Sequence, residues 1–254
     1  QGLYVSTEMF VNGMMHLIEQ GVVKRRVYDD LALQTGLNEG RISETIDERL
    51  FAYARDCGLL PRVLDEKSVA TLKSFGLLPQ DLILSDERLI LGAQRLANDL
   101  DDAATSTALL EGVASQNLRG GRFLHGGFFL GPADFYRKLR EADAAMQDGI
   151  CMTSVLRTNQ LLQDPQLYMA QRRDARFINT GMMVSLSGAV TSDALEDGTV
   201  VSGVGGQYNF VAMAHDLPGA RSVLCVRATR HGHDGVVSNI VPHYGHVTIP
   251  RHLR

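Results

Sequence analysis

Hydrophobic and polar positions follow two different periods along the chain, and the alternation predicts a mixture of strands and helices. Apolar residues recur every three or four positions, as on one helix face, at residues 10–18 and 133–146. Strands that alternate with helices are typical of α/β domains. We therefore predict an α/β fold with an open, mostly parallel sheet and helices on both faces. Short apolar runs typical of buried strands lie at residues 2–5, 122–125, 150–155, 177–186, 190–191 and 222–226.

The middle of the chain has a different character, because charged residues surround its apolar positions. A capping-box pattern begins at Thr45 and precedes apolar residues at helical spacing. Gly76 and Pro79 separate two further stretches of similar spacing. The pattern predicts three or four amphipathic helices, with three of them at residues 45–54, 65–75 and 86–100.

A glycine-rich stretch, residues 202–210, lies between a strand-like run at 199–201 and an apolar segment that begins at Phe210. Three glycines in four residues allow the backbone to approach a ligand closely. Successive N–H groups there, together with a helix N-terminus, can bind a negative oxygen. A closely packed turn is the alternative interpretation. A dinucleotide-binding loop, and with it an oxidoreductase, is disfavoured because the third glycine of G-x-G-x-x-G is absent.

Glu8 stands where the pattern predicts that a strand ends and a helix begins, and Gly21 ends that helix. Open α/β folds bind their ligands at the carboxyl edge of the sheet, which makes Glu8 a candidate catalytic residue. A carboxylate in a first helical turn is also explained by the helix dipole alone.

These stretches resemble the acetyl-CoA hydrolase/transferase family, which includes 4-hydroxybutyrate CoA-transferases and belongs to the glutamate-dependent CoA-transferases. Residues 202–210 resemble the G-x-G-G-Q-x-D-F loop of the family, and residues 6–10 resemble its T-E-M-(F/I)-S-D-G nucleophile motif. Two positions depart from the pattern: Asn209 stands at the usual aspartate, and Val11-Asn12-Gly13 replaces S-D-G. The resemblance continues at residues 122–131, 177–181, 238–242 and 247–251.

The resemblance implies a domain organisation. Residues 1–23 and 121–254 correspond to the C-terminal catalytic domain of the family. Shorter relatives connect Val23 to the region of Phe123 more directly, so residues 24–120 are expected to be a helical insertion. The resemblance also implies that the chain is a fragment and that an N-terminal domain of the same chain precedes it.

The resemblance further implies an enzyme in which Glu8 attacks an acyl-CoA thioester and then carries coenzyme A as a glutamyl thioester. Transfer of coenzyme A to a carboxylic acid is the leading interpretation, and acyl-CoA hydrolysis through the same intermediate is its neighbour. A non-catalytic assembly module built on this fold is the alternative from another class. The residues expected at the site are catalytic Glu8, oxyanion-binding and CoA-binding Gly203, Gly205, Gly206 and Gln207, and supporting Asn179 and Asn209.

The composition and charge of the chain limit the classes of partner that can be expected. The chain has 254 residues, 44% of them hydrophobic and 21% charged, which is ordinary for a soluble globular protein. A net charge of -4 argues against a nucleic-acid surface. No apolar run reaches the roughly 18–20 residues that cross a membrane, and no signal peptide is evident.

Metal sites and disulfides are not expected. The three cysteines lie far apart without a C-x-x-C pair, which favours reduced thiols and a cytoplasmic location. His231-Gly232-His233 lacks a third ligand at helical spacing. We expect no bound cofactor, with coenzyme A entering only as part of the acyl-CoA substrate. The expected partners are acyl-CoA, a carboxylic acid and the N-terminal domain, and a homodimer is compatible with the resemblance.

Overall fold

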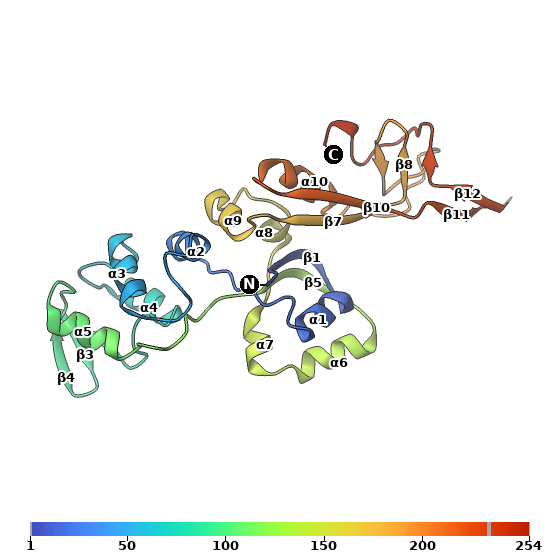
Figure 1. The fold of residues 1–254 in the computed structure, drawn as a ribbon. Coiled ribbons are helices and arrows are strands. Elements are labelled where there is room, and N and C mark those ends of the chain that lie inside the picture. The colour runs from blue at the N-terminus through green and yellow to red at the C-terminus, as the bar shows by residue number, and fades with distance from the viewer. Residues whose placement is uncertain (1, 233–234, 254) are drawn as a thin grey trace. The chain divides into compact units, whose positions relative to one another are not determined.

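A computed structural model describes residues 2–232 and 235–253 and divides the chain into two compact units (Figure 1). The first unit comprises Gln1–Tyr4, Gln20–Leu124 and Lys138–Cys151. The second comprises Val5–Glu19, His125–Arg137 and Met152–Arg254. His233, part of the histidine pair considered above, lies outside the described residues.

The predicted α/β class is confirmed, because parallel strand pairs and helices alternate along the chain. A parallel sheet with the strand order β1-β5-β6 is flanked by helices. The remaining described strands form further sheets of only two or three strands, so the parallel pairings are distributed over small sheets. The strands of the first sheet are β1 (Val5–Val11), β5 (Leu124–Leu130) and β6 (Ile150–Met152).

The first unit contains helices that begin at aspartate N-caps. Asp47 accepts a hydrogen bond from the amide of Leu50, so the N-cap lies two residues after the predicted Thr45. Asp30, Asp65 and Asp102 cap the other three helices in the same way. The four helices are α2 (Leu31–Asn38), α3 (Glu48–Asp56), α4 (Glu66–Ser74) and α5 (Ala103–Glu111).

The predicted helix over residues 86–100 is wrong, because this segment belongs to an antiparallel sheet. Asp86 and Glu87 both have positive φ angles, of 49° and 56°, and form the two-residue turn of a hairpin. Leu89 and Leu91 are two residues apart, which fits the period of a strand and not that of a helix. The sheet has the order β2-β3-β4, with β2 (Ile83–Ser85), β3 (Arg88–Leu91) and β4 (Gln94–Ala97).

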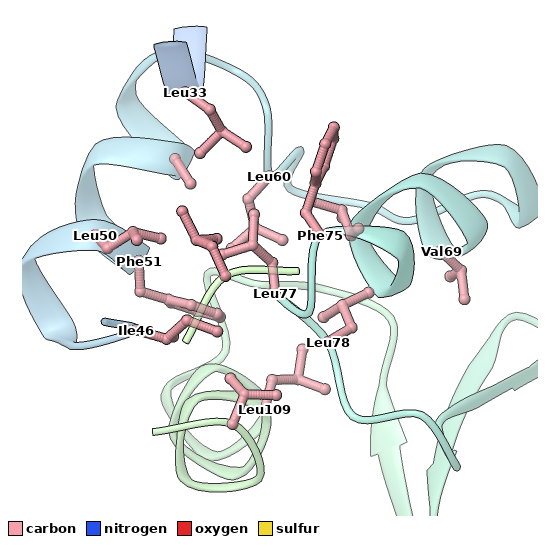
Figure 2. Close-up of a cluster of buried hydrophobic side chains, with 14 of the residues drawn as sticks. Leu33, Ile46, Leu50, Phe51, Leu60, Val69, Phe75, Leu77, Leu78 and Leu109 are labelled. Carbon is pink, nitrogen blue, oxygen red and sulfur yellow. The ribbon is translucent and has the colours of Figure 1, made fainter. Parts of the chain in front are cut away.

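One continuous hydrophobic core holds these helices and the three-stranded sheet of the first unit together (Figure 2). Its side chains come from α2, α3, α4, α5 and the connecting segments, and many are completely buried. Burial of each such side chain stabilises a fold by about 1.5–3 kcal/mol, so this unit has its own source of stability. The labelled members include Leu33, Ile46, Leu50, Leu60, Leu77 and Leu109.

The observed boundary between the units differs from the predicted one, since residues 138–151 cluster with the segment that precedes β5. The Arg122 guanidinium pairs with the Asp148 carboxylate at 2.6 Å, and the Phe123 amide donates to the carbonyl oxygen of Gly149. Burial raises the pKa of Asp148, but the hydrogen bond and charge of Arg122, with a contribution from Arg26, bring it below its ordinary value. The predicted helix at 133–146 is divided into α6 (Ala133–Glu141) and α7 (Ala144–Gly149), with Asp143 as the N-cap of α7.

In the second unit, the glycine-rich stretch is followed by a helix and then by a strand. The strand-like run at 199–201 forms only an isolated bridge between Ala194 and Val200, so this strand was predicted wrongly. α10 (Gln207–Asp216) packs on the parallel pair β7 (Arg176–Gly181) and β10 (Arg221–Val226). Phe177, Met213 and Leu217 form the buried core between these elements.

Shorter elements complete the described part of the second unit. Phe10 of β1 meets Phe135 of α6 edge to face, with ring centroids 5.3 Å apart. No helix within residues 2–232 and 235–253 is long and apolar enough to cross a membrane. The remaining elements are α1 (Asn12–Glu19), α8 (Val155–Asn159), α9 (Pro165–Gln171), β8 (Met183–Ser185), β9 (Val190–Thr191), β11 (Thr229–Gly232), β12 (Gly235–Ser238), β13 (Ile240–Val241) and η1 (Arg251–Leu253).

An ion pair in the first unit gives a prediction about pH. Arg62 donates to both carboxylate oxygens of Asp99, at 2.9 and 2.8 Å, and these bonds lower the pKa of Asp99 to about 2. Because the folded-state pKa lies below the unfolded value of about 3.9, the pair stabilises the fold above pH 4 and its contribution is lost as the pH falls through about 2. Arg62→Ala should therefore raise the pKa of Asp99 toward 4, measured by carboxyl NMR titration.

Asp65 provides the matched control, since the pKa of this carboxyl is lowered by the side chain and amide of Ser68 at the start of α4. Its titration should be the same in Arg62→Ala as in the wild type. An Asp99 that still titrates near pH 2 without Arg62 would contradict the assignment of the shift to this pair.

Candidate functional site

Glu8 lies in the middle of strand β1, four residues before α1 begins. The predicted position at a strand-to-helix junction is therefore wrong, because the strand continues through Val11. The side chain is half-buried, and α8 packs on this strand. A residue held in a paired strand has a fixed backbone, which suits a side chain that must meet other groups at defined positions.

Asn159, the last residue of α8, provides the hydrogen bond to Glu8. Its Nδ2 donates to Glu8 Oε2 at 2.9 Å. A carboxylate oxygen only accepts, so the amide nitrogen must face Glu8 and the amide oxygen must face away. That oxygen accepts from the hydroxyl of Thr158 at 2.8 Å, and both Thr158 and Asn159 are buried. The Asn159 amide is thus held in one orientation.

The glycine loop meets the same carboxylate from the other side. A Cβ atom on Gly206 would lie 2.4 Å from both Glu8 Oε2 and Asn159 Nδ2, which is far inside contact distance. A Cβ on Gly205 would lie 3.4 Å from Glu8 Oε1, and Gly205 has a φ of +56°, which L side chains rarely adopt. The predicted close approach of this loop to a negative oxygen is therefore present, and the oxygen belongs to Glu8.

The loop leads directly into α10, and its last residue, Gly206, lies beside the carboxylate. Gly206 is the N-cap residue of α10 and supplies no side-chain hydrogen bond to the helix. The first-turn N–H groups of a helix have no partner inside the helix, and its N-terminus carries a partial positive charge. A carboxylate beside Gly206 is therefore in a favourable electrostatic environment.

Gly127 of β5 allows a second close approach, to the backbone of Glu8. A Cβ there would lie 2.8 Å from the Glu8 carbonyl oxygen and 2.8 Å from Val155 Cγ1. This close packing lies within a strand.

The other predicted site residues have different surroundings. Gln207 is buried, and its Nε2 donates to the carbonyl oxygen of Thr180 at 2.8 Å, so it ties α10 to β7. Gly203 is exposed, with no neighbouring side chain close to the position of a Cβ. Asn179 lies in β7 with a buried Nδ2 that has no partner within the described residues. Asn209 is exposed on α10.

Asn159 was not among the residues predicted to support Glu8, a role that was assigned to Asn179 and Asn209. The polar pair Thr158-Asn159 stands a few residues after the apolar run at 150–155, at the end of α8. That local pattern is a usable signal, but it does not identify a partner 151 positions away along the chain.

Chemically, the arrangement is a carboxylate with one oxygen fixed by an amide donor and a helix N-terminus close by. Such a group can act as a nucleophile without a separate base, because the carboxylate form is already the nucleophilic one. Glycine backbone beside it can donate hydrogen bonds to a second oxygen that gains charge during a reaction.

Residues 131–254 match the sequence profile of the acetyl-CoA hydrolase/transferase C-terminal domain. The search of curated proteins found no match to the chain.

Among solved structures, a crystal structure of RipA from Yersinia pestis is 18% identical and covers 90% of this chain, with a TM-score of 0.37. A mutant structure of RipA is 31% identical over 52% of this chain, with a TM-score of 0.41. The aligned region of this chain spans 43% of the first RipA chain and 27% of the second.

The steric requirement at position 206 gives a test of the site geometry. Gly206 has φ -87° and ψ 6°, which alanine tolerates, so Gly206→Ala introduces only the collision with Glu8 and Asn159. We expect the Asn159–Glu8 hydrogen bond to break and the protein to lose about 1–3 kcal/mol of stability. The measurements are the side-chain amide NMR signal of Asn159 and denaturant unfolding.

Gly203→Ala is the matched control, because a Cβ at position 203 has only the Gly205 amide nitrogen near it, at 4.0 Å. It should leave both the Asn159 signal and the stability close to wild type. An unchanged Asn159 signal in Gly206→Ala would show that the loop does not constrain the carboxylate.

Proposed function

We propose, because residues 131–254 belong to the acetyl-CoA hydrolase/transferase C-terminal domain family, that the full-length protein transfers coenzyme A between acyl-CoA and a carboxylic acid. The observation that carries the proposal is the contact of Glu8 with Asn159 and with the glycine loop in one unit. The family match supports acyl-CoA as the substrate class, and this contact supports Glu8 as the reacting carboxylate.

In the first step, a Glu8 oxygen attacks the carbonyl carbon of the acyl thioester. The C–O bond forms as the C–S bond breaks, which gives an acyl-glutamyl anhydride and the thiolate of coenzyme A. Oε2 accepts the hydrogen bond of Asn159, and both oxygens lie close to Gly205. We assign the attack to Oε1, since Asn159 holds the other oxygen.

In the second step, the thiolate attacks the glutamyl carbonyl carbon and the anhydride C–O bond breaks. The first acid leaves as its carboxylate, and Glu8 carries coenzyme A as a thioester. A second carboxylate then repeats both steps in reverse and leaves as the new acyl-CoA. Every step develops charge on a carbonyl oxygen, and loss of one preorganised N–H donor at such an oxygen typically costs about 2.7–4 kcal/mol.

The N–H groups of Gly205 and Gly206 are the donors that we propose for this oxygen. Gly206 is the N-cap residue of α10, so the start of this helix fixes the directions of the Gly205 and Gly206 N–H groups. The absence of a Cβ atom at 206 lets the loop come within reach of the reacting carboxylate. Asn159 stabilises the carboxylate while it is the nucleophile or the leaving group.

The covalent intermediate gives the first test. Full-length protein incubated with acetyl-CoA and no acid, then treated with borohydride, should carry a mass change on the peptide with Glu8, located by peptide mapping. Glu8→Gln should abolish the change. Glu66→Gln, which alters a glutamate of the first unit, should retain it.

The outcome also separates the three interpretations. Formation of propionyl-CoA after addition of propionate supports transfer, while loss of the adduct in water alone supports hydrolysis through the same intermediate. Coenzyme A that binds without any change on Glu8 would overturn the covalent mechanism and favour the assembly module.

Asn159→Ala gives a second prediction. The carboxylate loses a charge-assisted hydrogen bond, typically about 1.5–3 kcal/mol, so adduct formation should slow by about 10- to 100-fold. The rate is measured by quenched-flow with mass detection. Thr158→Val should have a smaller effect in the same direction, because it frees the Asn159 amide to turn. An unchanged rate in Asn159→Ala would contradict the role given to this contact.

A further inference from the structure

The start of the glycine loop is attached to a single backbone carbonyl. The amides of Val201 and Ser202 both donate to the carbonyl oxygen of Asp193, at 2.8 and 3.1 Å. Residues 194–200 between them form a small hairpin, closed by the Ala194–Val200 bridge. The position of Asp193 therefore sets where the chain enters the loop.

The side chain of Asp193 is bound in turn by residues near the end of the chain. Its Oδ1 lies 2.9 Å from Nε2 of His246 and accepts a hydrogen bond from the hydroxyl of Thr248. The Asp193 side chain is only 15% exposed, compared with 37% for His246. These bonds, from Thr248 first and from His246 second, lower the pKa of Asp193 below its ordinary value.

The segment that supplies these donors is itself fixed to β9. The amides of Thr248 and Ile249 donate to the carbonyl oxygen of Val190, and the amide of Val190 donates to Ile249. The amide of Ser192 donates to the Thr248 hydroxyl at 2.9 Å, so Thr248 bridges the backbone and the Asp193 carboxylate. Asp193 is thus held in two ways. Residues 190 and 192 are hydrogen-bonded to residues 248 and 249, and the Asp193 carboxylate is hydrogen-bonded to His246 and Thr248.

The other end of the loop has an independent attachment. Gln207, the first residue of α10, donates to the carbonyl oxygen of Thr180 in β7. The glycine loop is therefore attached by hydrogen bonds at both ends, to Asp193 before the loop and through Gln207 after it. Gly205 and Gly206, which lie between the two attachments, are the loop residues that approach Glu8.

We infer that Asp193 is a positioning residue for the reaction at Glu8, acting through His246 and Thr248 to hold the glycine loop where its amides meet the reacting oxygen. This inference rests on the proposed function. Asp193 does not itself touch the reacting atoms. Misplacement of catalytic groups by about 1 Å can cost on the order of 100-fold in rate, so a loop released at one end should lower kcat.

The test compares two substitutions at Asp193 in the full-length protein. Asp193→Ala should lower kcat by about 10- to 100-fold and change KM for acyl-CoA less than about threefold, with an unfolding midpoint near that of the wild type. Asp193→Asn keeps an oxygen that accepts from Thr248 and His246, and it should restore most of kcat. A kcat of Asp193→Ala equal to that of the wild type overturns the inference, as does an Asp193→Asn that is no better than the alanine variant.

Asp197 provides the matched control in the same hairpin. Its carboxylate accepts a hydrogen bond from the nearby amide of Thr199, at 2.9 Å, and it is exposed. Asp197→Ala should keep kcat within about twofold of the wild type. An equal loss of kcat in both alanine variants would attribute the effect to the hairpin as a whole and overturn the specific role of Asp193.

Thr248→Val gives a result even where Asp193→Ala does not fold, because it removes one hydroxyl and keeps the shape of the side chain. It should lower kcat by about three- to tenfold, and an unchanged kcat counts against the inference. Amide hydrogen exchange of residues 203–206 in the substrate-free protein, faster in Thr248→Val and unchanged in Asp197→Ala, tests the positioning without any turnover. Exchange that is unaltered in Thr248→Val overturns the inference. Failure of the wild type to form an adduct on Glu8 would remove the proposed function and leave this exchange result to stand by itself.

Discussion

The candidate site depends on a close approach of backbone to carboxylate, and that approach exists only because residue 206 has no side chain. The space that a Cβ would need is already occupied by Glu8 Oε2 and Asn159 Nδ2. Three segments far apart in the sequence therefore converge on one carboxylate: a strand, the last residue of a short helix and a helix N-cap. Each contributes a different interaction, namely a fixed backbone, a neutral hydrogen-bond donor and the partial positive charge of a helix terminus.

The two units obtain their stability in different ways. The first has one large apolar core to which four helices and a small sheet contribute. The second is held by small apolar clusters and by many polar bonds between segments, among them the ladder of Val190 with Ile249 and the bonds of Asp193. Polar bonds of defined geometry orient groups better than apolar contacts do, and a catalytic loop needs orientation more than it needs burial. The site proposed at Glu8 lies in the second unit, while the first unit is stabilised by its own apolar core.

The sequence predicted the α/β class and the most important loop for physical reasons that are local. Three glycines in four residues indicate that the backbone comes close to another group, and in the structure that group is the Glu8 carboxylate. The resemblance identified Glu8, but only the fold could show that it lies inside a strand, because strand length depends on pairing with β5. The segment at 86–100 was misread as a helix, since Leu89 and Leu96 fit a helical spacing while the two positive-φ residues of its turn leave little trace in the sequence. Asn159 was missed for a related reason: a polar residue at the end of a short helix carries no local record of the distant residue that it contacts.

The asymmetry of the Glu8 carboxylate has a chemical consequence for the proposed reaction. A nucleophile that becomes the leaving group in the last step of the cycle must be stabilised as an anion in both steps, yet it must not be stabilised so strongly that attack becomes slow. One neutral donor on Oε2 meets this requirement better than an arginine or lysine would, because a full charge would hold the carboxylate in its ground state. The strongest stabilisation then belongs to the oxygen that gains charge only in the transition state, for which the loop amides are the proposed donors. On this reasoning the neutrality of Asn159 is as important as its position, and a cationic side chain in its place would be expected to bind Glu8 more tightly while slowing the reaction.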